Sequence, residues 1–84
     1  MDKEINNNKY KGASFDKAIV VETKNSLFGI AYEYKTLTEM YPIHKITLQS
    51  VTENNGKFYD VFELDLPNKE KTVVYFDISN FYGK

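Results

Sequence analysis

Residues 45–78 constrain the fold most, because they contain three runs in which apolar and polar residues alternate. Such alternation is typical of β-strands that bury one face. Two segments rich in turn-forming residues, 53–57 (ENNGK) and 67–71 (PNKEK), separate the runs. The pattern predicts a three-stranded antiparallel meander that supplies most of the buried surface of the chain.

The first hairpin can be built with either of two loops. Asn-Gly at 55–56 is a strong signal for a two-residue turn, but that turn sets Leu48 opposite Glu63. A three-residue loop over 54–56 sets Leu48 opposite Phe62 and gives Gly56 the left-handed position. We therefore predict the three-residue loop. The same register pairs Ile46 with Leu64, Val51 with Tyr59, Thr47 with Glu63 and Lys45 with Asp65.

The second hairpin leaves two registers open. Pro67 suits the first central position of a type I turn. One register sets Phe62 against Phe76, and the other sets Asp65 against Lys71. In both registers one face of the meander is apolar, and it carries Phe62, Leu64, Leu66, Val74, Phe76 and Ile78.

The opposite face of the meander is unusually apolar for a surface in water. We expect it to carry Val51, Tyr59, Val61, Val73 and Tyr75, beside Glu63, Asp65 and Asp77. A contiguous apolar patch on a small domain often marks an interface, and aromatic residues are enriched at interface cores. Either Phe81 and Tyr82 fold back over this patch, or a protein partner or a second copy binds it. The interface candidates are Val51, Tyr59, Val61, Val73, Tyr75, Phe81 and Tyr82.

The first half of the chain predicts a disordered segment, a strand and a helix. Residues 1–14 are polar and are expected to be disordered, which leaves 15–84 as one domain. Residues 18–23 (AIVVET) read as a strand inside the sheet or covered on both faces, because both parities are apolar at its centre.

The predicted helix begins after Asn25 or Ser26, either of which can cap it, and Pro42 ends it. Gly29 is expected to make the first turn irregular, and Glu33 falls on the polar side. The apolar stripe consists of Leu27, Ile30, Ala31, Tyr34, Leu37, Thr38 and Tyr41.

Together these elements predict an α+β fold of order β-α-β-β-β. It is a single layer of four strands with a C-terminal antiparallel meander and one helix packed on one face. If the first strand joins this sheet, it lies parallel to either the second or the fourth strand, and the sequence leaves both edges open.

Composition excludes several classes of function. The net charge is −1 and all 11 basic residues are lysine, which argues against nucleic acid and anionic membranes. The absence of cysteine excludes disulfides and thiolate chemistry and fits a cytoplasmic location. The start of the chain has no secretory signal pattern, and the longest aliphatic run, 18–21, is too short to span a bilayer.

No group of residues makes a convincing case for an enzyme or a cofactor. His44 has no nameable partner for general base catalysis, so we interpret it as a surface imidazole. Glu63, Asp65 and Asp77 are too few for a calcium site, and lysines can pair with them across strands. The alternative function is binding of single-stranded nucleic acid, with bases stacked on Tyr59 and Tyr75. The acidic neighbours of these tyrosines argue against it. We predict a non-enzymatic domain without metal or cofactor.

Two short blocks resemble small uncharacterised bacterial proteins of strand–helix–hairpin order. They are 20–22 (VVE) followed by 26–29 (SLFG), and the closing 74–84 (VYFDISNFYGK). The resemblance implies a bacterial origin and carries no activity or site residue with it.

Overall fold

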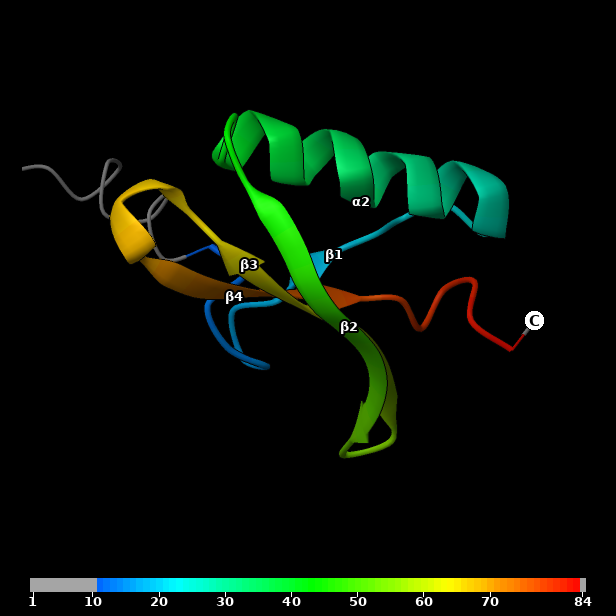
Figure 1. Ribbon diagram of the computed structural model, residues 1–84. Helices are drawn as coiled ribbons and strands as arrows, with labels where there is room; N and C mark the ends of the chain where they lie inside the picture. Colours follow the sequence, from blue (N-terminus) through cyan, green and yellow to red (C-terminus); the bar gives the residue numbers. More distant parts are fainter. Residues whose placement is uncertain (1–10, 84) are drawn as a thin grey trace, which may run out of the picture.

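A computed structural model describes residues 11–83, so the predicted disorder of residues 1–10 lies outside the described part of the chain. The elements are β1 (Ile19–Val20), α2 (Ser26–Met40), β2 (Lys45–Asn54), β3 (Lys57–Asp65), a short 3₁₀ turn (Pro67–Lys69) and β4 (Lys71–Asp77). They form one sheet of order β1-β4-β3-β2, with α2 lying across one face (Figure 1). The predicted α+β fold with one helix is confirmed. Below, the side beneath α2 is called the helix-facing side and the other side the open face.

The first hairpin contains a two-residue turn, so the predicted three-residue loop is wrong. Asn54 pairs with Lys57, and the left-handed angles of Asn55 (φ 55°) and Gly56 (φ 81°) match the turn that Asn-Gly favours. Leu48 accordingly lies opposite Glu63, so the predicted Leu48–Phe62 pair is wrong. In this register Val51 pairs with Asp60, not Tyr59, and moves from the open face to the helix-facing side.

A bulge in β2 reconciles the turn with the hydrophobic pattern. The register shifts between Ile46 and Leu48, and beyond the shift Ile46 pairs with Leu64 as predicted. The intervening Thr47 donates its hydroxyl to the carbonyl oxygen of Glu63 at 3.1 Å. One extra residue in β2 therefore allows the two-residue turn at one end of the hairpin and the pairing of Ile46 with Leu64 at the other.

The second hairpin takes the register that opposes Asp65 and Lys71. These two residues form an ion pair at 2.7 Å, and Phe62 lies opposite Val74 instead of Phe76. The turn places Asn68 and Lys69 in the left-handed region. The charged pair and the apolar face are both preserved in this arrangement.

β1 is an edge strand, not an interior one. It runs parallel to β4, with Ile19 opposite Phe76, which decides the edge that the sequence left open. Ile19 and Val21 are buried, whereas Val20 is half exposed. The expectation of a strand inside the sheet or covered on both faces is therefore wrong.

The segment before β1 belongs to the domain. Gly12 is buried, and its carbonyl oxygen accepts a hydrogen bond from the Tyr75 amide at 2.7 Å. Its left-handed angle (φ 80°) and its closeness to Val74 both favour glycine. Gly12, which lies in the segment expected to be disordered, is thus packed against β4.

α2 begins and ends where the sequence predicts but is rotated about its axis. The Asn25 side chain accepts from the Phe28 amide at 3.0 Å and caps the helix. The buried residues are Gly29, Glu33 and Leu37, of which only Leu37 belongs to the predicted stripe. The placement of Glu33 on the polar side is wrong.

Gly29 explains the rotation. A Cβ atom there would lie 2.5 Å from the ring of Phe81, so only glycine allows the helix and that ring to approach so closely. The helix is regular from Ser26, and the expected irregular first turn is absent from it. A glycine that looked like a helix breaker in the sequence serves as a packing contact.

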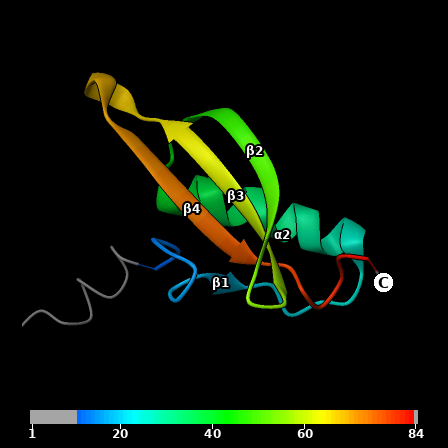
Figure 2. The ribbon, with the colours of Figure 1, turned by 90° about the horizontal axis from the view of Figure 1, so that it is seen from below.

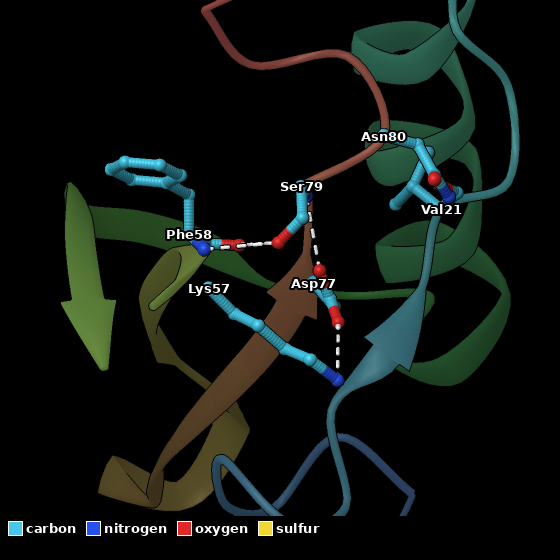
Figure 3. Close-up of polar contacts among 6 residues, drawn as sticks. All are labelled: Val21, Lys57, Phe58, Asp77, Ser79 and Asn80. Atoms are coloured by element: carbon cyan, nitrogen blue, oxygen red, sulfur yellow. Dashed lines mark hydrogen bonds and ion pairs between the residues drawn. The ribbon is translucent and has the colours of Figure 1, made fainter. Parts of the chain in front are cut away.

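The chain after β4 runs beneath the N-terminal half of α2 (Figure 1). Figure 3 shows the polar contacts that hold it: Ser79 Oγ accepts from the Phe58 amide at 3.0 Å, and Asn80 donates to the Val21 carbonyl oxygen at 3.0 Å. Phe81 then enters the core. The buried core residues are Ile19, Val21, Leu37, Phe62, Leu64, Val74, Phe76, Ile78 and Phe81.

Candidate functional site: a groove between the helix and the second strand

A groove of about 410 Å³ lies between α2 and β2 on the helix-facing side. Its walls come from α2 and β2, and its floor comes from β3 and the chain after β4. We call it the α2–β2 groove. It is lined by Ser26, Ile30, Tyr34, Gln49, Val51, Asp60, Ile78, Phe81, Tyr82 and Gly83.

Tyr34 joins the two walls of the groove. Its ring meets the ring of Phe62 edge-on at a centroid distance of 5.9 Å, and its hydroxyl donates to Gln49 Oε1 at 3.4 Å. The rotation of α2 leaves Tyr34 and Ile30 exposed beside the core instead of within it. Apolar side chains of the helix therefore border the groove.

The two-residue turn between β2 and β3 orients the other wall. Because the register turns Val51 to the helix-facing side, its exposed side chain lies in the groove opposite the helix. Tyr82 closes the end of the groove, with its ring 5.0 Å from that of Phe58. Strand register and helix rotation together create this site.

Two carboxyl groups are buried where α2 meets β3. Glu33 is 0% exposed and Asp60, which lines the groove, is 5% exposed. Neither Glu33 oxygen nor Asp60 Oδ1 receives a hydrogen bond from any other described group, and the two carboxyl groups bond to each other through a proton on Glu33. Burial raises the pKa of Glu33 to about 9, and the neighbouring Asp60 adds to the rise. Glu33 is therefore protonated at neutral pH.

The predicted sheet-face site is divided in the structure. The ring of Phe15 packs edge-on against Tyr59 and Tyr75, at centroid distances of 4.9 and 4.8 Å, and Tyr59 is only 6% exposed. The open face is thus covered at this point by the segment before β1, which Figure 2 shows beside β1 and β4. Base stacking on Tyr59 and Tyr75 would require Phe15 to move away.

The other five interface candidates lie in two places. Val61, half-buried, and Val73, exposed, stay on the open face. Val51, Phe81 and Tyr82 line the α2–β2 groove, with Phe81 itself buried. The idea that the chain end covers the open face is wrong, because that end turns to the helix-facing side.

The remaining candidates have structural partners. His44 Nδ1 lies 2.7 Å from the Tyr41 carbonyl oxygen. Asp65 pairs with Lys71, and Asp77 lies 3.9 Å from the Lys57 ammonium (Figure 3). Within residues 11–83 no group of three or more possible ligands could hold a metal ion.

The sequence reading missed Glu33, Asp60, Ile30 and Tyr34 as site residues. Asp60 has the same strand parity as Phe62, which was a signal that it faces the helix. Glu33 stands four residues from both Gly29 and Leu37 and shares their helical face. Both signals were overruled by the usual exposure of acidic residues.

Comparison of the chain with protein-family models, curated proteins and solved structures found no match. The resemblance to short bacterial proteins therefore stays a prediction. In the described part of the chain, α2 is too short and too polar to cross a membrane.

Proposed function

We propose that this chain is a small non-enzymatic protein-binding domain, and that it binds a segment of another protein in the α2–β2 groove. One observation carries the proposal: Ile30 and Val51, 43% and 46% exposed, face the same groove from two different elements. Most binding sites are concave and mainly apolar, with a few polar groups that fix orientation.

The lining supports binding more than catalysis. Aromatic and aliphatic side chains dominate it, and tyrosine is a common anchor at protein interfaces. Apolar side chains left half in water beside a groove gain free energy when a partner covers them. The open face offers a partner less uncovered apolar surface, since Phe15 already covers its two tyrosines.

Selection from a displayed random peptide library tests the proposal. Peptides enriched on the wild-type chain should lose binding to the double variant Ile30→Gln/Val51→Gln, which removes the apolar walls. The matched control is Leu48→Gln/Val73→Gln, which alters open-face residues of similar exposure (51% and 37%) and should keep binding. No enrichment, or an equal loss in both variants, would overturn the proposal.

Sedimentation at micromolar concentration separates the two possible occupants. A monomer is expected if the partner is another protein. A dimer that Ile30→Gln/Val51→Gln dissociates would identify a second copy as the occupant instead.

A further inference from the structure

We propose that the partner segment inserts one lysine or arginine side chain into the α2–β2 groove, with its charged group against Asp60. The inference rests on the proposed function and adds the chemistry that the groove selects. It starts from the two buried carboxyl groups, for which the only donor shown is the proton that Glu33 directs to Asp60.

Asp60 is placed to receive a donor from the groove. It lies opposite Phe76 and Val51 on the helix-facing side of β3, and it belongs to the groove lining. A buried polar atom without a partner is costly, and native structures contain few of them. A cationic N–H group that enters from the groove would add a second hydrogen bond to the Asp60 carboxyl and neutralise its buried charge.

Glu33 makes the pair suitable for a single positive charge. Because Glu33 keeps its proton at neutral pH, the two groups together carry one negative charge, that of Asp60. Calcium prefers six or more oxygen ligands, more than these two side chains supply. An ammonium or guanidinium group matches the pair in charge and donates N–H groups to carboxyl oxygens.

The walls suit the stem of such a side chain. Lysine and arginine pack their methylene groups along apolar surface while the charged end finds polar partners. Ile30 and Val51 provide that surface, and Tyr34 and Tyr82 also line the groove. The groove thus has apolar sides and an acidic base.

The peptide selection described above tests the inference when its sequences are compared. Enriched peptides are expected to share one lysine or arginine flanked by apolar residues. No enrichment on any variant would remove the proposed function itself. Enriched peptides that need Ile30 and Val51 but show no preference for a basic residue would leave the function standing and overturn this inference alone.

A double-substitution cycle then locates the contact. In the best peptide, the basic residue is replaced by its neutral counterpart, citrulline for arginine or norleucine for lysine. On the wild-type chain this should weaken binding about tenfold or more, since hydrogen bonds to charged groups are strong. On Asp60→Asn the same replacement should have little effect.

The control for the cycle is Glu63→Gln on the same strand, where the exposed carboxyl lies on the open face. The peptide replacement should weaken binding to this variant as much as to the wild type. An equal effect on Asp60→Asn and Glu63→Gln would show that the cation binds elsewhere and would overturn the inference. Thermal unfolding of both variants checks that they remain folded.

Discussion

The open face of the sheet and the helix-facing side both carry more apolar surface than a small domain leaves in water, but they are covered differently. On the open face, a short segment before β1 places Phe15 over Tyr59 and Tyr75. On the helix-facing side, α2 covers the centre and leaves a groove between Ile30 and Val51.

The difference teaches that an apolar strand pattern identifies surface to be covered but not the segment that covers it. One well-placed aromatic ring is enough for two tyrosines, because edge-on ring contacts need little chain. A helix is a rigid cylinder, so its rotation decides which side chains border its flanks. Here the contact between Gly29 and Phe81 sets that rotation.

The largest loss of stability should come from a substitution at the centre of the helix-facing side. Phe62 is 0% exposed and contacts the rings of both Tyr34 and Phe76. Phe62→Ala should lower the free energy of unfolding by about 3–5 kcal/mol, through lost burial and a cavity. Denaturant unfolding measures this. A loss below about 1 kcal/mol would contradict the packing described here.

The buried carboxyl on the same side should make stability depend on pH. The pKa of Glu33 is raised from 4.5 when unfolded to about 9 when folded, so the folded chain holds the extra proton between these values. Stability should therefore be highest below pH 4.5 as far as this group is concerned, and should fall as pH rises towards about 9. The slope from this group is at most about 1.4 kcal/mol per pH unit.

Glu33→Gln should remove that slope, because the amide is neutral throughout. Denaturant unfolding at a series of pH values checks this, with Glu39→Gln on the exposed side of α2 as the matched control. A wild-type slope that survives in Glu33→Gln would show that another group titrates.

Phe15, which covers the open face, should contribute less to the free energy of unfolding than Phe62 does. Phe15→Ala removes two edge-on ring contacts, each worth about 0.5–1.5 kcal/mol, so a loss of about 1–3 kcal/mol is expected. Exposure of Tyr59 should also raise its rate of chemical labelling. If neither stability nor labelling changes, Phe15 does not cover this face.

The smallest effect on stability is expected in the groove walls. Ile30→Gln/Val51→Gln alters partly exposed side chains, and the free energy of unfolding should change by no more than about 1 kcal/mol. The open-face control Leu48→Gln/Val73→Gln should change it by a similar amount. A much larger loss in the first variant would mean that the groove walls belong to the core.

The sequence predicted the elements better than their rotation and register. The helix bounds and the meander could be predicted from the sequence, because the signals for them act locally: Asn25, Pro42 and the alternating runs. The bulge at Thr47 could not, because it follows from two preferences that conflict only when both ends of the hairpin are paired. The groove depends on the two-residue turn, which turns Val51 to the helix-facing side, and on Gly29, which acts through its contact with the distant Phe81.

The most direct test of the docking site is to map amide chemical shifts of the full chain by NMR as the best selected peptide is added. The account predicts shifts concentrated at Ile30, Tyr34, Gln49, Val51 and Asp60, with Val73 and Glu63 on the open face unchanged. Shifts concentrated on the open face, with the α2–β2 groove unaffected, would contradict it.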